Sequence, residues 1–427
     1  MLRNSIKAVI LTFVNFVLFN HFVSGQILGC IDPSASNYND KATVNDGSCL
    51  YSSQQLSSLN FVSLAKNADH LLEMSGLEKN DSLWYTHNDN PSNAFYEIHR
   101  VGDSIFQKRS IVVKGLNVVD WEEMAADSLY FYLGDFGNNV NGVRKDLKIV
   151  KVKKSFHNNL LDDSLEWVEN IHFSYSDQID FTPLSANKTD FDCEAMIVLG
   201  DSIFLFSKQW QSLNTRIYRL AKTGDNQVAE KITEIPINGL VTGAKLSPDK
   251  KKLALVGYSN LLQPFVCCVY GFQKNDYQFG CIRKLNVNMP FYQMEGICWE
   301  NDSIVSVVNE KFVNAFVQTN PAMQQYNLGF CWEKLYRNQL GVGKFEEMNL
   351  KLRVLPNPIQ QNETLKLILE GANRCLPVRE EIYVSNMKGQ KLMTIQMTSD
   401  HIELNHLVPG EYVIGSQKVG FVTISVI

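Results

Sequence analysis

The sequence lacks several features that would point to a membrane, nucleic-acid-binding or helical protein. Beyond residues 1–25 there is no apolar run long enough to span a bilayer. The formal net charge is −5, so there is no basic excess for nucleic acid or an anionic membrane. Long stretches with the 3.6-residue apolar repeat of a surface helix are nearly absent, which favours β structure.

Motifs of the common enzyme classes are missing as well. The chain has no Gly-x-Ser-x-Gly turn for a serine nucleophile, no His-Glu-x-x-His zinc helix and no Cys-x-x-Cys pair. Gly341-Val342-Gly343-Lys344 lacks the upstream glycine spacing and the hydroxyl residue of a phosphate-binding loop. The sequence therefore gives no support to any of these chemistries.

The chain begins with the pattern of an export signal. A charged start, an apolar stretch too short to span a membrane and a small-residue cleavage site follow one another in residues 1–25. We predict that these residues are removed and that the mature protein is secreted or held on the outer cell surface. The alternative is a lipid anchor on Cys30, because Ile27-Leu28-Gly29-Cys30 loosely resembles a lipoprotein box.

Nine cysteines are an odd number for an exported chain. Cys30 and Cys49 bracket a short polar segment and are predicted to form a disulfide, whose loop closure adds roughly 3 kcal/mol of stability. The other cysteines lie mostly within apolar runs, where an unpaired thiol acts as a small hydrophobic side chain. They are Cys193, Cys267, Cys268, Cys281, Cys298, Cys331 and Cys375.

A short phrase recurs through the middle of the chain. An acidic residue and an apolar step precede Asp-Ser-Leu or Asp-Ser-Ile, which opens a new apolar run. Copies of the phrase end at Asp81, Asp127, Asp201 and Asp302, and a copy without the acid ends at Asp249. Repetition at this spacing indicates strand–turn–strand units of a repeat architecture. Asp-Ser is interpreted as a turn that feeds a strand, or alternatively as an O-glycosylation acceptor.

The middle region, residues 53–345, is rich in short aromatic and β-branched runs such as Ser128–Leu133 and Ile203–Phe206. About 290 residues, at about 40 to 50 residues for a four-stranded blade, predict a six-bladed β-propeller. Two packed sheets are the alternative, but they would not explain why one phrase recurs with its acidic residue in the same place. Residues 351–427 form a separate strand-rich unit, and the predicted fold class is all-β.

Acidic residues gather at the predicted strand ends. The phrase puts Glu123, Glu194 and Glu295 at equivalent places, so we expect these side chains to converge near the propeller axis. Converging carboxylates need a cation, bound protons or basic partners, and their oxygens suit Ca²⁺ or Mg²⁺ better than zinc. For each acid, the alternative is that it binds backbone N–H groups of a turn. The predicted metal ligands are Asp89, Asp120, Glu123, Asp135, Asp192, Glu194 and Glu295.

Two functional hypotheses follow from these residues. The first is a binding or scaffold propeller on the cell surface with Ca²⁺ in or near its channel. The second is a metal-assisted hydrolase of an ester, lactone or phosphoester, in which His87 or Glu123 is the base and Arg144 and Lys208 hold the anion. Convergent polar groups favour activity, whereas the lack of a specific nucleophile favours binding. For His87, the alternative is a hydrogen bond to its own turn.

Residues 26–52 closely resemble a small module of surface proteins from gliding-type bacteria. The match is carried by Gly29-Cys30 at the start and Asp46-Gly47-Ser48-Cys49 at the end. Oxygen-bearing side chains of the module are interpreted as calcium ligands or as caps of turns. These residues are Asp32, Asn37, Asp40 and Asp46.

Residues 351–427 resemble the C-terminal sorting domain of the type IX (Por) secretion pathway, a small β-sandwich. The matching positions are Pro356-Asn357-Pro358, the Gly389 turn and Leu407 with Gly410-x-Tyr412, whereas the apolar end, Ser425-Val426-Ile427, departs from the usual basic finish. The resemblance implies that the secretion machinery reads this tail and removes it. The product would then be released or coupled to surface lipopolysaccharide.

The middle region resembles a family of exported six-bladed propellers, distantly like the esterase-like phytase and gluconolactonase groups. The resemblance implies a ligand site, for a surface polysaccharide or a small molecule, without naming a substrate. The matching phrases are Trp84-x-x-His87-Asn88-Asp89, Asp120-Trp121-Glu122, Gly134-Asp135-x-Gly137-Asn138-Asn139, Phe191-Asp192-x-Glu194-Ala195, Thr242-Gly243-Ala244 and Glu295-Gly296.

Overall fold

The structure is a computed structural model that describes residues 26–65, 71–80, 83–89, 92–154, 164–339, 351–355, 364–370, 381–387, 390–396, 401–403, 407–416 and 420–426. The predicted signal peptide, Cys375, the Pro356 motif and Gly389 lie outside these residues. The chain divides into two compact units between Arg337 and Asn338. Nearly all regular structure in the described ranges is β-strand, which confirms the all-β prediction. The helical elements there are η1 (Tyr277–Phe279), η2 (Gly329–Cys331) and α1 (Glu333–Gln339).

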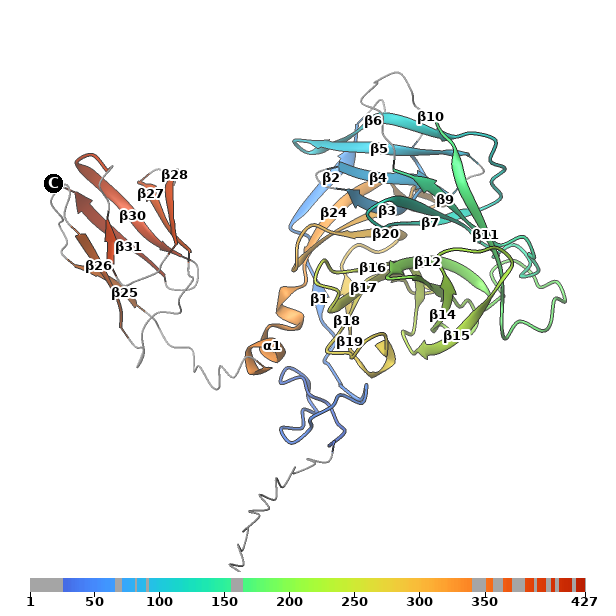
Figure 1. Cartoon of the computed structure of the whole chain (residues 1–427), viewed down its shortest axis with the longest axis horizontal. Coiled ribbons are helices and arrows are strands. Elements are labelled where there is room, and N and C mark those ends of the chain that lie inside the picture. The colour runs from blue at the N-terminus through green and yellow to red at the C-terminus, as the bar shows by residue number, and fades with distance from the viewer. Residues whose placement is uncertain are drawn as a thin grey trace, which may run out of the picture. The chain divides into compact units, whose positions relative to one another are not determined.

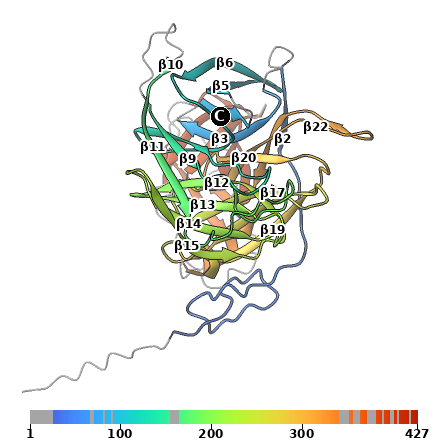
Figure 2. The ribbon, with the colours of Figure 1, turned by 90° about the vertical axis from the view of Figure 1, so that its right-hand side faces the viewer.

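The first unit contains, in its described residues, five four-stranded antiparallel blades (Figures 1 and 2). In each blade the strands follow one another from the ring axis outward. They are β3 (Met74–Asn80), β4 (Leu83–Asn88), β5 (Ala94–Val101) and β6 (Ser104–Val113); β7 (Trp121–Ala126), β8 (Tyr130–Asp135), β9 (Lys148–Lys153) and β11 (Trp167–Tyr175); β12 (Asp192–Leu199), β13 (Ser202–Lys208), β14 (Thr215–Ala221) and β15 (Gln227–Ile235); β16 (Leu240–Leu246), β17 (Lys252–Tyr258), β18 (Pro264–Tyr270) and β19 (Cys281–Val287); and β20 (Met294–Trp299), β21 (Ile304–Asn309), β24 (Ala322–Asn327) and β2 (Asn60–Leu64).

The five inner strands β3, β7, β12, β16 and β20 each contact the next and close a ring. The described residues therefore form a five-bladed propeller, and the prediction of six blades is wrong. The long interval between the phrases at Asp127 and Asp201 holds two long loops, 136–147 and 176–191, rather than a further blade. The last blade is completed by β2, which comes from the start of the chain and pairs with β24.

Each inner strand carries a β-bulge close to its first residue. The unpaired residue is Glu122 in β7, Glu194 in β12 and Thr242 in β16, and the bulges of β3 and β20 fall at 75–76 and 295–296. A β-bulge changes the direction in which a side chain points. Here the bulges lie where neighbouring inner strands approach each other most closely. Close approach also requires glycine, because a Cβ on Gly296 would overlap the carbonyl oxygen of Ser75.

The blades pack on one another through buried apolar faces, as the aromatic and β-branched runs of the sequence predict. Between the first two blades, for example, the ring of Phe131 lies 5.1 Å from that of Tyr85 and 5.4 Å from that of Phe95. The Asp-Ser phrase forms turns: both Leu129 and Tyr130 donate backbone hydrogen bonds to the Asp127 carboxylate. This bears out the turn interpretation for that copy.

The predicted disulfide between Cys30 and Cys49 is present. Asp32 of the same module is fully buried and accepts hydrogen bonds from Tyr51 and Tyr270, the latter in β18. Strand β1 (Gln55–Leu56) then pairs in parallel with β19, so the module is docked on the fourth blade. Asp46 caps the turn at Ser48. The described cysteines outside the disulfide are buried free thiols, as predicted: Cys193, Cys267, Cys268, Cys281, Cys298 and Cys331.

The second unit has two antiparallel sheets in its described residues. One holds β25 (Lys351–Leu355), β26 (Thr364–Glu370) and β29 (His401–Glu403); the other holds β28 (Lys391–Gln396), β27 (Glu381–Asn386), β30 (Gly410–Ser416) and β31 (Gly420–Val426). The hydroxyl of Tyr412 donates to the carbonyl of Val408 across 2.7 Å. The first unit also contains the short strands β10 (Ser164–Leu165), β22 (Phe312–Val313) and β23 (Gln318–Thr319). No helix in the described part of the chain has the length and apolarity to cross a membrane.

Candidate cation site at the channel mouth

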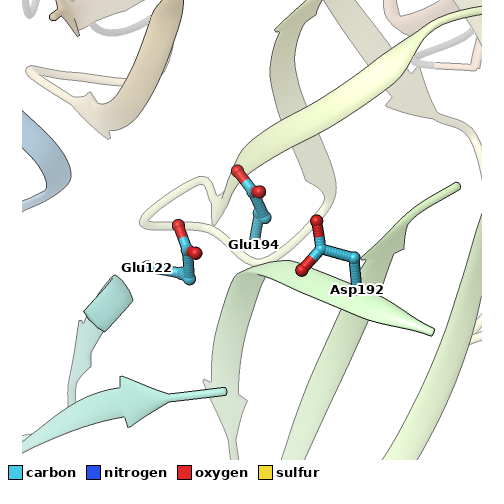
Figure 3. A group of neighbouring side chains, drawn as sticks. All are labelled: Glu122, Asp192 and Glu194. Carbon is cyan, nitrogen blue, oxygen red and sulfur yellow. The ribbon is translucent and has the colours of Figure 1, made fainter. Parts of the chain in front are cut away.

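Three carboxylates meet where β7 and β12 begin (Figure 3). Glu122 comes from β7 and Asp192 and Glu194 from β12, and one oxygen of each lies within 4.8 Å of the others. Each of these side chains is buried, with exposed fractions of 5%, 0% and 3% in that order. Glu122 and Glu194 are the bulge residues of their strands, so the bulges bring them together.

The loop after β8 contacts two of the three carboxylates. Asp192 accepts a hydrogen bond of 2.6 Å from the backbone N–H of Asn138 and one of 2.8 Å from the indole of Trp210. Gly137 makes room for Glu122, because a Cβ at that position would overlap the carboxylate. Asp192 is therefore held by the loop after β8 and by Trp210, and the same loop leaves space for Glu122.

Lys208, at the end of β13, is the cation buried among these acids. Its Nζ lies 2.9 Å from a carboxylate oxygen of Glu194 and donates to the Tyr258 hydroxyl at 3.0 Å. It also lies 4.7 Å from the ring centre of Trp210. The nearby acids hold the pKa of Lys208 well above its usual range, although burial alone would lower it. One ammonium thus faces several carboxylates.

Burial raises the pKa of Glu122, Asp192 and Glu194 above the ordinary range. Their mutual repulsion raises the pKa of Glu122 and Glu194 further, and Lys208 opposes the shift in all three. The raised pKa values mean that the negative charges of the three ionised carboxylates are not fully balanced by the residues around them. A cation in this position would relieve the repulsion.

Further acids line the same mouth. Burial and then neighbouring carboxylates raise the pKa of Asp89 to about 7, that of Asp120 to about 6 and that of Glu310 to about 9. Glu295, on the bulge of β20, is 6% exposed, and its Oε2 has no hydrogen-bond partner among the described residues. Repulsion from Glu295 contributes to the raised pKa of Glu194, so this carboxylate faces the same group.

Asp135 and Arg144 have a different setting from the one predicted. Asp135 is fully buried between Arg144 at 3.0 Å and Lys148 at 2.8 Å, and it also accepts the backbone N–H of Asp120. Arg144 donates to the carbonyl of Gly137 at 2.7 Å. Both residues thus hold the loops that carry the mouth, and the acidic triad of Glu122, Asp192 and Glu194 does not include them.

His87 is fully buried behind the mouth. Its Nδ1 lies 3.0 Å from the carbonyl oxygen of Asn88, and its ring packs edge-on against Trp121, with centroids 5.6 Å apart. Burial lowers the pKa of this imidazole to about 4. The ring therefore bonds to its own turn and is neutral at physiological pH; a role as base stays a prediction.

The predicted equivalence of Glu123 with Glu194 and Glu295 is wrong by one residue. The bulge residue of β7 is Glu122, and Glu123 occupies the next position. Its carboxylate points across the ring, where it accepts the backbone N–H of Ala244 at 3.2 Å and lies 3.8 Å from Nζ of Lys245. Burial raises the pKa of Glu123 to about 8.

Sequence reasoning missed Glu122, although a signal was available. In the other four inner strands the bulge residue is followed by a small one: Ser75-Gly76, Glu194-Ala195, Thr242-Gly243 and Glu295-Gly296. In β7 that position is Glu123, so the small residue is missing there, but the Asp-x-Glu spacing shared by Asp120-Trp121-Glu122 and Asp192-Cys193-Glu194 pairs Glu122 with Glu194. Two consecutive glutamates concealed the correct register.

No protein-family model and no curated protein matches the chain. Among solved structures, an exo-β-1,3-galactanase from Phanerochaete chrysosporium is 10% identical, with 87% of this chain and 98% of that one covered and a TM-score of 0.39. A GH43_1 enzyme from Xanthomonas citri with xylotriose is 10% identical (63% and 89% covered, TM-score 0.38). PorZ, a surface component of the type-IX secretion system of Porphyromonas gingivalis, is 9% identical (83% and 51% covered, TM-score 0.26). The propeller assignment rests on the strand pairing and not on these distant likenesses.

Proposed function

We propose that this chain is an exported β-propeller that binds a divalent cation, Ca²⁺, at its channel mouth and uses this face to bind a surface polysaccharide or a small molecule. The observation that carries the proposal is the buried triad of Glu122, Asp192 and Glu194 beside the unpartnered oxygen of Glu295. Carboxylate oxygens are the ligands that hard cations prefer. Lys208 supplies only one positive charge against them.

Terbium luminescence tests the cation site, because Tb³⁺ substitutes for Ca²⁺ at oxygen sites and is excited through a nearby indole. The indole nitrogen of Trp210 lies 2.8 Å from Asp192, so bound Tb³⁺ should emit on tryptophan excitation and Ca²⁺ should quench that emission. Glu194→Gln removes one ligand charge at nearly constant shape. It should weaken the apparent affinity for both ions by roughly tenfold or more.

A matched control is Glu230→Gln, which removes one carboxylate charge from the exposed pair with Arg219. Its terbium titration should equal that of the unmodified protein, and circular dichroism should show that both variants are folded. An absence of sensitised emission, or equal affinity in the Glu194→Gln protein, would refute the cation site.

Metal-assisted hydrolysis of an ester, lactone or phosphoester is the second candidate function. It is favoured by Asp89, whose pKa of about 7 suits a proton-transfer group, and by Glu310 beside it. The ion would polarise the substrate oxygen, and Asp89 would exchange the proton. A panel of these three substrate classes, with and without chelator, tests this function: activity that EDTA leaves unchanged, or no turnover at all, would argue against it.

We also propose that residues 351–427 address the protein to the type IX secretion machinery and that it reaches the outer surface. The two antiparallel sheets of the second unit support this, since the resembling domain is a small β-sandwich. In fractions of the native host, the processed product of the full-length chain should be on the surface or in the medium, and a chain truncated after residue 350 should be in the periplasm. Surface exposure of the truncated chain would refute the role of the tail.

A further inference from the structure

A third sulfur atom lies against the disulfide of the module formed by residues 26–52. Cys281, the first residue of β19, has its Sγ 3.7 Å from Sγ of Cys49, which is bonded to Cys30. All three residues are buried, and Cys281 is fully so. Sulfur atoms at this distance are in direct contact, so no other group separates the Cys281 thiol from the disulfide.

Contacts with the fourth blade hold this part of the module in place. Gly47 packs on the backbone of η1, because a Cβ there would lie 2.3 Å from the carbonyl oxygen of Gln278. The side-chain amide of Asn45 donates to the carbonyl oxygen of Phe279 at 2.6 Å. These two contacts seat the module on the turn that leads to Cys281, so the contact between the sulfur atoms belongs to a docked interface.

A thiol in contact with a disulfide can exchange with it. The Cys281 thiol loses its proton and its sulfur attacks Sγ of Cys49, so that the Cys49–Cys281 bond forms as the Cys30–Cys49 bond breaks. Cys30 leaves as a thiolate and takes up one proton. One disulfide and one thiol are present before and after, so the step needs no oxidant or reductant. The released thiol has an acceptor, because Sγ of Cys30 lies 3.9 Å from the carbonyl oxygen of Asp32.

The surroundings of Cys281 make this exchange slow in the folded protein. Burial raises the pKa of the Cys281 thiol to about 12, the nearby carboxylate of Asp32 raises it further, and a hydrogen bond from Tyr51 opposes both. The thiolate is the attacking form, so only a small fraction of the protein is reactive at neutral pH. Which of the two bonds is present is therefore decided mainly while the chain folds.

We propose that Cys281 is an alternative disulfide partner of Cys49 and that the Cys49–Cys281 bond covalently locks the module onto the fourth blade. The bond to Cys30 spans 19 residues, whereas the bond to Cys281 spans 232 and encloses β2, the strand that completes the last blade. From the dependence of loop closure on length, the longer loop restricts the unfolded chain about 40-fold more. The proposal does not depend on a cation at the channel mouth.

The full-length Cys30→Ser protein tests the proposal, because it leaves Cys49 without its present partner. We expect oxidised glutathione to join Cys49 to Cys281 in most of the folded molecules, as measured by alkylation of free thiols and peptide mass mapping. Reduction with dithiothreitol should then lower the folding equilibrium constant in urea by roughly tenfold or more. Free Cys49 and Cys281 thiols in the folded, oxidised variant would overturn the proposal.

The double variant Cys30→Ser/Cys281→Ser is the matched control, and dithiothreitol should leave its unfolding in urea unchanged. Cys193 and Cys298 are buried thiols of other blades and should stay unlinked in every sample.

The unmodified protein gives a second test that needs no substitution. After refolding in reduced and oxidised glutathione, it should yield both the Cys30–Cys49 and the Cys49–Cys281 peptides. Finding the Cys30–Cys49 peptide alone would overturn the exchange. Refolding in EDTA and in Ca²⁺ should give the same peptides, so a failure at the acidic mouth would not affect this result.

Discussion

A Lys208→Met variant should lose about 3 to 5 kcal/mol of unfolding free energy in EDTA, and saturating Ca²⁺ should restore much of it. Removing one partner of a buried ion pair leaves the other charge uncompensated, which costs about this much. Lys208 is 4% exposed and lies 2.9 Å from Glu194, so Glu194 would be that charge. Methionine keeps the apolar stem, and urea unfolding with and without Ca²⁺ measures the effect.

Ca²⁺ should restore the unfolding free energy because its binding is linked to folding. A ligand that binds only the folded protein adds about 2.7 kcal/mol when its concentration is a hundred times its Kd. Because the variant lacks the competing ammonium, it should gain more from Ca²⁺ than the unmodified protein does. Lys231→Met, at a half-exposed surface pair with Glu234, is the control and should show little change. Equal Ca²⁺ effects in all three proteins would contradict a cation site at the triad.

In EDTA, the raised pKa values of two acids determine how the stability of the folded protein should change with pH. The folded-state pKa values of Asp89 and Glu310 are raised to about 7 and about 9 from ordinary values of 3.8 and 4.5. The folded chain then binds more protons than the unfolded one, so stability falls as pH rises from about 4 to about 9. Bound Ca²⁺ should flatten this fall, since it favours the ionised carboxylates.

A Gly296→Ala variant should be destabilised by about 3 kcal/mol or more, and much of it should fail to fold. The added methyl group would overlap the backbone carbonyl oxygen of Ser75 and crowd Leu77, and neither backbone can move without opening the ring. The contact joins β20 of the last blade to β3 of the first, so it closes the circle. Soluble yield and urea unfolding both report the loss.

The matched control is Gly102→Ala, in the turn between β5 and β6. No atom lies within 4 Å of a Cβ there, and only the positive φ of +59° opposes alanine. Its cost should be about 1 kcal/mol. Similar stabilities for the two variants would mean that the glycine at the ring is not required for close approach.

The sequence predicted the local features of the fold better than the number of blades. Runs such as Ile203–Phe206 are strands, and Cys30 pairs with Cys49, because both depend on neighbouring residues. The number of blades depends on where the ring closes. Loop 136–147 lengthens the second blade and loop 176–191 lengthens the connection to the third, both without adding strands, and β2 joins a blade far away in sequence. Spacing alone cannot reveal either.

Part of the candidate site could be predicted in the same way. Asp192, Glu194, Glu295 and Lys208 meet at the mouth because each stands beside a strand end, which the pattern shows. The phrase points to Glu123 rather than Glu122 because two glutamates stand side by side in β7, and composition does not reveal which of them is the unpaired bulge residue. The burial of Asp135 by Arg144 and Lys148 depends on a loop conformation that no motif specifies.

The strand that completes the last blade has a consequence for how the chain acquires its structure. Asn60 of β2 bonds to Gln325 of β24, 265 residues further along. Pairing at such a separation is slow to form, and it requires the end of the propeller sequence to be present. During synthesis the ring therefore stays open until β24 is made, although β2 is among the first strands to emerge. Closure of the ring is therefore a late step, and a chain that ends before β24 would leave β2 without its antiparallel partner.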